Sequence, residues 1–298
     1  MAEPACLLTV IVPVYNEIAT VREVLDEVLA LPLDLEVIVI DNVSTDGTRE
    51  LVAQLAGAPR VLPVLQSLNR GKGSSVRVGL ALARGEFVII QDADLEYEPR
   101  QIPTLLAIAQ EQGRQAVFGS RLLGRRPLVP WHHALGRDAL NWLFRWLYGP
   151  RLTDIATCYK LMRTSLAQSL LLEAVGFDLD YELPCRLALA GCEIVESPVT
   201  YQPRDAAAGK KLRWTDGVAA LGALLRYRWR LPAPETVYEV GGAVMIVDGP
   251  FAACHGTVVE VAGRGEVVTV GFELHGREVR VPCRAGNLRP AEEAAPAQ

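Results

Sequence analysis

The first 120 residues alternate between continuous apolar runs of strand length and amphipathic segments of helix length. A run that is apolar at every position is typical of a strand buried on both faces, as in a parallel sheet covered by helices. Strands that alternate with helices through short loops predict an α/β fold with a mostly parallel sheet. The runs are Leu8–Val14, Leu35–Ile40, Val61–Leu65, Phe87–Ile90 and Ala116–Gly119.

The segments between these runs carry helix signals. Thr20-Val-Arg-Glu23 fits a capping box, in which side chains satisfy the first backbone N–H groups of a helix. Apolar residues then return at helical spacing, which indicates a helix with one buried face. Three more helices are predicted, from about Asp46, from about Gly73 and over Pro99–Gln112.

The remainder of the chain changes character twice. From residue 122 to about 231 the pattern is helical and irregular, and Pro232-Ala-Pro234 predicts a linker. Short strand-like runs with Gly-rich turns then predict a small all-β barrel of roughly 55 residues. We divide the chain into a domain at 1–232, a barrel at 235–290 and a disordered tail at 291–298. The runs in the barrel are Ala243–Val247, Thr257–Val261, Val267–Phe272 and Glu278–Val281.

Composition excludes several classes of protein. The 298 residues are 50% hydrophobic and 22% charged, as in ordinary globular domains, and the net charge of −5 provides no basic field for nucleic acid. No apolar run approaches the roughly 20 residues of a membrane-spanning helix, and the first residues lack the layout of a secretory signal. Six cysteines without a CxxC pair indicate neither a zinc site nor a disulfide framework. We expect a cytoplasmic protein.

Two carboxylates follow the fourth apolar run directly, at Asp92 and Asp94. The carboxyl ends of parallel strands meet at one edge of the sheet, where such sheets bind ligands. Carboxylates at i and i+2 can turn toward one hard cation, Mg²⁺ or Mn²⁺, which would neutralise the charge on a leaving diphosphate. A D-x-D alone is usually a solvated turn, so its place after a buried strand is what favours a metal site. Glu96 would add a contact beyond the metal ligands.

The loops after the first two runs are expected at the same edge. Asp41 would accept hydrogen bonds from a ribose or base, and Tyr15 would offer a ring for base stacking. Helix capping by Asn16, Ser44 and Asp46 is the alternative use of these loops, and we expect it as well.

The third helix opens with Asn69-Arg-Gly-Lys-Gly73, in which the glycines allow close approach and Lys72 supplies positive charge. Its spacing is not that of a P-loop. Only four of the 30 basic residues are lysines, and the general preference for Arg would spare a lysine where a compact ammonium is needed. The four are Lys72, Lys160, Lys210 and Lys211.

The ordered motifs VIVPVYNE, VIVIDNVSTDGT, NRGKG, FVIIQDADLEY and FGSR resemble family 2 glycosyltransferases of the GT-A fold. LTDIATCYKLMR and YQPRDAAAGKKLRWTDG further resemble the dolichyl- and polyprenyl-phosphate sugar transferase branch, so the resemblance covers about residues 7–230. It implies a metal-dependent, inverting transfer of a hexose from GDP-mannose or UDP-glucose to a polyprenyl phosphate.

The resemblance also implies roles for individual residues. Asp92 and Asp94 would bind the metal ion, and Arg121 of the GSR motif would bind phosphates. The nucleotide would contact Pro13, Tyr15, Glu17 and Asp41, and the diphosphate and metal would be served by Asp92, Ala93, Asp94 and Glu96.

Residues 204–230 contain seven basic side chains and two acidic ones. A lipid phosphate has a second pKa near 6, so it is already an anionic nucleophile at about pH 7. The transfer therefore requires no strong base. It requires cations that hold the acceptor phosphate and the donor diphosphate together against their repulsion. A charge run is usually a solvated helix face, but the family motif here favours phosphate binding by Lys210, Lys211 and Arg213, with Arg121.

Two alternatives concern the acceptor. A transferase acting on a hydroxyl needs a carboxylate base, for which Asp180 and Glu182 are the candidates, although packing or a loop-orienting hydrogen bond is an equal reading for Glu182. The aromatic and Arg-containing segment Trp131–Tyr148 would suit either a membrane interface or packing on the core. A membrane interface would place the protein peripherally on the cytoplasmic face.

The C-terminal motifs VGGAVMIVDGPFAACHGTVVEV and VTVGFELHGREVRVPCRAGNL resemble the KOW-containing SH3-like domain of NusG-type transcription factors. Residues 233–298 hold five Arg against nine Asp and Glu, which is a poor footprint for RNA. We therefore expect a protein-docking or structural role and no nucleic acid. Every candidate catalytic residue precedes this region, so it should not be needed for chemistry. A further alternative is an interaction protein with a vestigial transferase domain.

Overall fold

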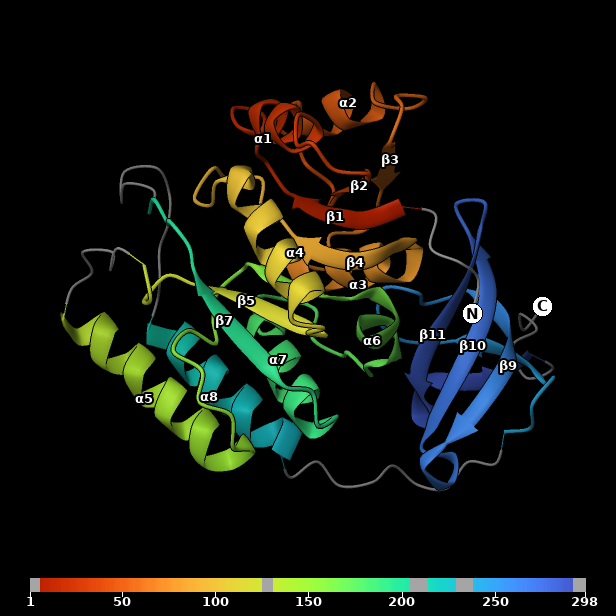
Figure 1. Cartoon of the computed structure of the whole chain (residues 1–298). Coiled ribbons are helices and arrows are strands. Elements are labelled where there is room, and N and C mark those ends of the chain that lie inside the picture. Colours follow the sequence, from red (N-terminus) through yellow and green to blue (C-terminus); the bar gives the residue numbers. More distant parts are fainter. Residues whose placement is uncertain (1–5, 125–130, 204–213, 229–237, 292–298) are drawn as a thin grey trace.

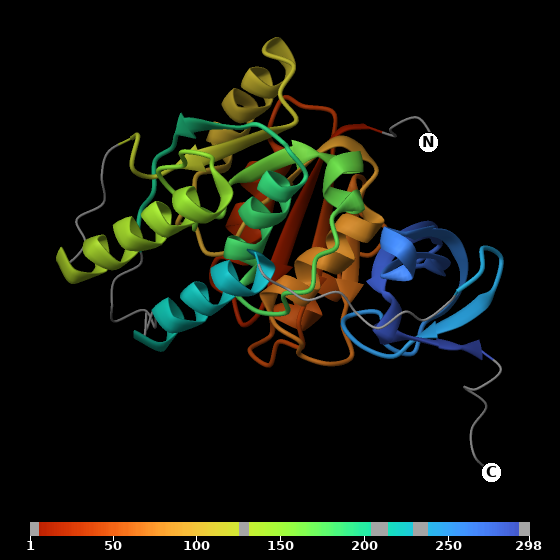
Figure 2. The same ribbon diagram turned by 90° about the horizontal axis from the view of Figure 1, so that it is seen from below.

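The computed structural model describes residues 6–124, 131–203, 214–228 and 238–291 (Figure 1). These residues form a larger α/β part and a smaller C-terminal β part, which lie beside each other in both views (Figures 1 and 2).

The α/β part is built on a seven-stranded sheet with the order β3-β2-β1-β4-β6-β5-β7. β1 pairs in parallel with both β2 and β4, and β2 pairs in parallel with β3. All five predicted strands are therefore confirmed, and their carboxyl ends meet at one edge as expected. The strands are β1 (Cys6–Val14), β2 (Leu35–Asp41), β3 (Val61–Leu65), β4 (Gly85–Ile90), β5 (Ala116–Ser120), β6 (Lys160–Arg163) and β7 (Ile194–Pro198).

The region after residue 122, predicted to be helical and irregular, contains helices but also supplies two strands that were not predicted, β6 and β7. β6 is antiparallel to both β4 and β5, whereas β7 is parallel to β5. Both strands are short and include polar residues, such as Lys160 and Glu196. They therefore lack the continuous apolar run that indicates a buried strand.

Helices pack around this sheet, with α3 against β1 and β2 and α4 against β5. The predicted capping box is wrong. Thr20 instead donates its hydroxyl to the backbone carbonyl of Ala93, at 2.7 Å, and to Glu17. The helices are α1 (Val21–Leu29), α2 (Thr48–Ala53), α3 (Lys72–Leu82), α4 (Ile102–Glu111) after a 3-10 turn at Pro99–Gln101, α5 (Trp131–Tyr148), α6 (Thr164–Ser169), α7 (Leu179–Leu189) and α8 (Trp214–Arg228).

The C-terminal part is a five-stranded antiparallel sheet with the order β11-β10-β9-β8-β12. The four predicted runs are confirmed as strands, and a fifth strand reaches Pro290. The predicted linker at 232–234 lies outside the described residues, as does the predicted tail at 291–298 except for residue 291. The strands are β8 (Ala243–Ile246), β9 (His255–Ala262), β10 (Val267–Leu274), β11 (Arg277–Arg284) and β12 (Leu288–Pro290), with 3-10 turns at Gly263–Gly265 and Ala285–Asn287.

The centre of the larger part is formed by the strands that were predicted to be buried. Val10, Ile38 and Ile89 have no exposed surface, as expected for strands covered on both faces. Among the described helices, none combines the length and apolar character needed to cross a bilayer. The C-terminal sheet packs through β11 against α3 and α6.

Candidate active site

Three loops at the carboxyl edge of the sheet are joined by hydrogen bonds. Asn16, after β1, accepts from the backbone N–H of Thr45 at 2.8 Å and donates its own N–H to Ser44 at 2.9 Å. Thr20 links the same loop to the backbone carbonyl of Ala93 after β4. The predicted capping residues are thus used mainly to connect loops, which makes the ends of β1, β2 and β4 one continuous surface.

A recess of about 470 Å³ opens on this surface. Small-molecule sites typically have volumes of about 300–1,000 Å³. Glu17 and Asp94, both predicted site residues, line the recess, whereas Pro13 is half-buried within β1 and Tyr15 is 49% exposed on the loop. The lining residues are Asn16, Glu17, Ile18, Ala19, Thr20, Asp46 and Asp94.

Asp41 has no exposed surface. Its carboxylate accepts hydrogen bonds from the backbone N–H groups of Val43 at 3.1 Å and Ser44 at 3.2 Å, and it pairs with Arg49. The observed role of Asp41 is to shape the loop after β2. Its predicted contact with a nucleotide would require that loop to open.

Lys72 connects the third loop to the carboxylate pair. Its ammonium lies 2.8 Å from Oδ1 of Asp92 and 3.6 Å from Oδ2 of Asp180. Asp180 also lies 3.6 Å from the ammonium of Lys160, which is completely buried. Two lysines and two aspartates, from α3, the loop after β4, β6 and α7, therefore form one largely buried charge cluster that includes the first aspartate of the D-x-D motif.

The pKa values of the two lysines in this cluster are shifted in opposite directions. Burial alone would lower the pKa of Lys72, but Asp180 and Asp92 raise it well above its ordinary value. Burial lowers the pKa of Lys160, and Asp180 offsets only part of that effect. Lys72 is thus a permanent cation at the site. In the sequence, Lys160 is one of only four lysines and lies in the motif LTDIATCYKLMR, but neither feature predicts its position beside Asp180.

The carboxylates of Asp92 and Asp94 fit a hard cation by their chemistry. Within the described ranges no cluster of three His, Cys, Asp or Glu side chains is placed to hold a metal ion. A cation held by these two carboxylates would take its remaining ligands from diphosphate oxygens and water. Glu96 is buried and its carboxylate accepts from the hydroxyl of Tyr201 at 2.8 Å, so it supports the loop rather than facing the recess.

Arg121, predicted to bind phosphates, forms an ion pair with Asp154. Its Nε and one Nη each donate to Asp154 at 2.7 Å, and its guanidinium lies over the ring of Tyr201. Burial lowers the pKa of Arg121, but the bonds to Asp154 outweigh it and raise the pKa well above its ordinary value. The pair accounts for the position of Arg121, and phosphate binding by it remains a prediction.

Glu182 is fully buried and makes the loop-orienting hydrogen bonds that the sequence offered as one alternative. Its carboxylate accepts from the backbone N–H groups of Glu173 at 2.9 Å and Ala174 at 2.7 Å, and it pairs with Arg186. Burial raises the pKa of Glu182 despite these bonds. Asp180, two residues earlier, is the carboxylate that reaches the charge cluster.

Helix α5 has one packed face and one exposed face. Phe144 is fully buried and Leu147 nearly so, while Leu135, Trp142 and Trp146 are 60–67% exposed. Packing on the core is confirmed for one face of the helix, and the membrane interface stays a prediction for the exposed face. The neighbouring α8 packs against it and exposes Leu221, Leu225, Arg226 and Arg228. Lys210, Lys211 and Arg213, predicted to bind the acceptor phosphate, lie outside the described residues.

Residues 9–171 match the sequence profile of glycosyl transferase family 2, which is more than half of the chain. The chain belongs to this family.

Two curated relatives extend the similarity. An undecaprenyl-phosphate mannosyltransferase of Micrococcus luteus is 29% identical over 234 residues, which are 75% of this chain and 93% of the relative. Glycosyltransferase AglJ of Haloferax volcanii is 32% identical over 208 residues, which are 68% of this chain and 64% of AglJ. Family membership and these names identify the chain as a glycosyltransferase enzyme.

Solved structures show the same fold. Glucosyl-3-phosphoglycerate synthase of Mycobacterium tuberculosis, in complex with UDP, superposes with a TM-score of 0.57 at 23% identity over 80% of this chain and 84% of that one. The same enzyme with Mn²⁺, UDP and glucosyl-3-phosphoglycerate gives 0.55 at 22% identity, over 87% and 89%. At this identity the likeness establishes a GT-A-like α/β fold.

Proposed function

We propose that this glycosyltransferase moves a hexose, with inversion, from GDP-mannose or UDP-glucose to a polyprenyl phosphate. The observation that carries the proposal is the similarity to the undecaprenyl-phosphate mannosyltransferase over 93% of its length. The name of that relative states a lipid phosphate as acceptor. The chain spans only 64% of AglJ, so AglJ supports the family and not the acceptor.

We propose that Mg²⁺ or Mn²⁺ is held by Asp92 and Asp94. Solved structures of the same fold contain Mn²⁺ or Mg²⁺ together with UDP. When bound, such a cation would neutralise the charge of the leaving diphosphate. Asp94 lines the recess, and Asp92 is the carboxylate that Lys72 contacts.

In this proposal the recess holds the nucleotide, with the ring of Tyr15 beside it and Glu17 in its wall. Lys72 supplies a fixed positive charge next to the diphosphate, because the two flanking carboxylates keep it protonated. A second positive centre close to the metal site would reduce the repulsion between two phosphate groups as they approach.

The acceptor side also fits a lipid. A phosphate monoester is an anionic nucleophile near neutral pH, so no strong base is required. The exposed apolar faces of α5 and α8, with exposed arginines beside them, have the composition of helices that lie in a membrane interface. We propose that these helices hold the protein peripherally on the cytoplasmic face, with Lys210, Lys211 and Arg213 binding the acceptor phosphate.

A hydroxyl acceptor is the second candidate, and one observation favours it. Asp180 projects from α7 into the charge cluster that contains Asp92, so it is a carboxylate close to the D-x-D motif. The carboxylate of Glu182, the other predicted base, already accepts hydrogen bonds from the backbone N–H groups of residues 173 and 174. If the acceptor is a hydroxyl, Asp180 is therefore the residue to test.

A separate proposal concerns the C-terminal sheet. We propose that residues 235–290 form a KOW-type SH3-like domain that docks onto protein and does not bind nucleic acid. The excess of acidic over basic residues in this region supports the second part.

The decisive experiment is a transfer assay with matched acceptors. Labelled GDP-mannose or UDP-glucose is incubated with Mn²⁺ and either polyprenyl phosphate or the corresponding free polyprenol. Labelled lipid from the phosphate alone supports the proposal, and label on the free alcohol supports the hydroxyl alternative. Consumption of neither donor with any lipid phosphate would refute the proposal. Asp92→Asn, measured in parallel, reports the background.

A further inference from the structure

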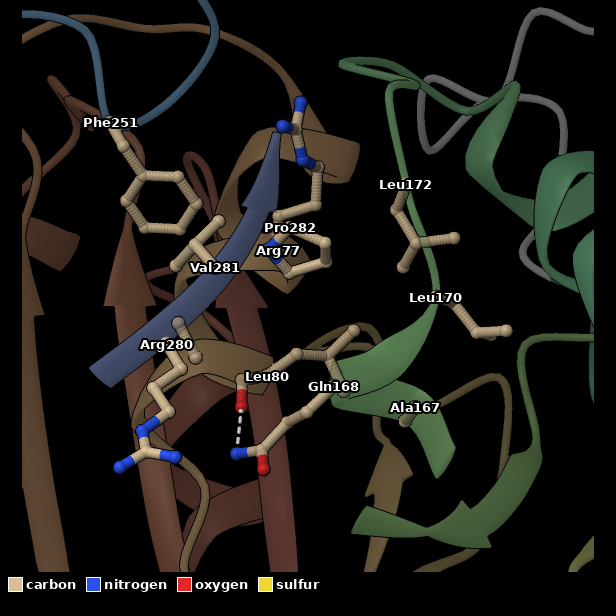
Figure 3. A pocket seen from close by; sticks show the side chains of 11 residues that line it. Arg77, Leu80, Ala167, Gln168, Leu170, Leu172, Phe251, Arg280, Val281 and Pro282 are labelled. Atoms are coloured by element: carbon tan, nitrogen blue, oxygen red, sulfur yellow. Dashed lines mark hydrogen bonds between the residues drawn. The ribbon is translucent and has the colours of Figure 1, made fainter. Parts of the chain in front are cut away.

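The C-terminal sheet is attached to the α/β part by two ion pairs on the same strand. Arg277 and Arg284 begin and end β11, where they pair with Glu36 at 2.9 Å and Glu173 at 2.7 Å. All four side chains are only 14–15% exposed. Between the pairs, Phe251 and Val281 face Leu80 of α3 across a cavity of about 30 Å³, room for about one water (Figure 3).

The two ion pairs attach to different places. Glu36 lies near the start of β2, at the opposite end of that strand from Asp41 and the site. Glu173 lies in the segment between α6 and α7, and its carboxylate is shared by Arg284 and Arg186. Both arginines donate charge-assisted hydrogen bonds, which are the stronger kind. The C-terminal sheet therefore supplies one of the cations that hold the side chain of Glu173.

The turn that carries Lys72 packs directly against the segment from Glu173 to Val175. The backbone N–H of Ser74 donates to the carbonyl of Val175 at 3.1 Å. A Cβ at Gly71 would lie 2.5 Å from the carbonyl oxygen of Val175, and one at Gly73 would lie 2.6 Å from that of Ala174. Only glycine permits this approach on both sides of Lys72.

These contacts form a continuous path from the C-terminal sheet to the metal-site carboxylate. Arg284 binds the side chain of Glu173, while Glu182 fixes the backbone of the same segment. This segment packs against the turn at Gly71–Gly73, and the side chain of Lys72 extends from that turn to Asp92. By contrast, Arg277 donates to the carbonyl of Leu82, at the far end of α3.

We propose that Arg284 is a positioning residue for this glycosyltransferase, through which the C-terminal sheet holds Lys72 at the donor diphosphate. The inference rests on the proposed function for the identity of the ligand. It reverses the expectation that the C-terminal region is dispensable because every candidate catalytic residue precedes it. The C-terminal sheet is a part of the binding site's support rather than an independent module.

The chain offers a matched pair of variants for the test. Arg284→Met and Arg277→Met each remove one buried guanidinium from the same strand and the same interface, but only Arg284 touches the segment that seats Lys72. The full chain is titrated with UDP and with GDP, each with Mn²⁺, by calorimetry. Coupling through packed contacts is typically about 0.5–2 kcal/mol, so we expect Arg284→Met to weaken nucleotide binding roughly fivefold to tenfold.

Arg277→Met should leave the dissociation constant within about twofold, since mutations without shared partners act independently. Arg284→Lys, which keeps a cation near Glu173, should recover part of the affinity. Nucleotide affinity of Arg284→Met equal to that of Arg277→Met would overturn the inference. If the unaltered chain binds neither UDP nor GDP with Mn²⁺, the proposed function fails instead, and the two failures are thereby distinguished.

Discussion

At the scale of single residues, Asp94 offers the cleanest test of metal use, because it lines the open recess and is only partly buried. Asp94→Asn keeps the shape of the side chain and removes the charge that would bind Mg²⁺ or Mn²⁺. A metal ion contributes several kcal/mol of charge stabilisation, so we expect turnover to fall at least about 100-fold. Transfer rates over a range of Mn²⁺ concentrations measure this effect. Near-normal turnover at low Mn²⁺ would contradict the metal assignment.

Lys72 should contribute to both stability and ligand binding, since it separates two carboxylates. Lys72→Met would leave Asp92 and Asp180 close together without their shared cation. Breaking a largely buried ion pair typically costs about 3–5 kcal/mol. Denaturant unfolding should show this loss, and added Mn²⁺ should restore more stability to the variant than to the original chain. An equal Mn²⁺ response in both proteins would show that Asp92 does not bind the ion.

The sequence was informative about residues whose chemistry follows directly from their place in a strand–helix unit. Asp92, Asp94 and Lys72 could be placed at one edge because each follows or precedes a strongly patterned element. Arg121 and Glu96 could not, because their partners, Asp154 and Tyr201, come from distant parts of the chain. A charged residue in a motif looks the same in sequence whether it faces a ligand or a buried counter-ion.

At the scale of elements, β6 carries a buried cation into the sheet, and this should be visible in the pH dependence of stability. Burial lowers the pKa of Lys160 below its ordinary value of 10.5. Between the lowered and the ordinary pKa the unfolded chain binds more protons than the folded one, so stability rises with pH in that window. Lys160→Met removes this contribution.

The measurement is the difference in unfolding free energy between the original chain and Lys160→Met. That difference should move in favour of the original chain between neutral pH and about pH 10. Urea titrations of both proteins at each pH supply it. A difference that is constant, or that moves the other way, would contradict the lowered pKa.

The exposed face of α5 leads to a prediction about membranes. Trp142→Ser with Trp146→Ser removes two large side chains that are 65% and 67% exposed, so the packed face around Phe144 is untouched. Burying one such side chain is typically worth about 1.5–3 kcal/mol, so binding to anionic vesicles should weaken at least about tenfold. Vesicle sedimentation measures it. Val240→Ser, which alters another exposed apolar residue, is the control and should bind like the original chain.

The elements also show why part of the fold could not be predicted. β1, β2 and β4 are buried on both faces, so they are visible in the sequence as continuous apolar runs. β6 and β7 are held in the sheet by their neighbours, and their own four and five residues carry little pattern. Four of the five strands of the C-terminal sheet could be predicted because glycine-rich turns separate them, whereas β12 has only three residues.

At the scale of the whole molecule, the two parts behave as one unit through the buried interface at β11. Removing everything after Pro232 would expose Leu80, Leu170 and Leu172, which line the cavity there, to water. It would also leave Glu36 and Glu173 without Arg277 and Arg284. Exposed apolar surface costs about 25 cal/mol per Å², and each buried carboxylate that loses a partner adds to the loss.

We therefore expect a chain ending at Pro232 to unfold at lower denaturant concentration and to bind nucleotide with Mn²⁺ at least as weakly as Arg284→Met. The reason is that the truncation removes the support of Glu173 together with the rest of the interface. Calorimetry and urea unfolding of the two chains side by side provide the measurement. The sequence taken alone favours the opposite result, because no candidate catalytic residue follows Pro232. Full nucleotide affinity in the shortened chain would make the C-terminal sheet a separate module after all.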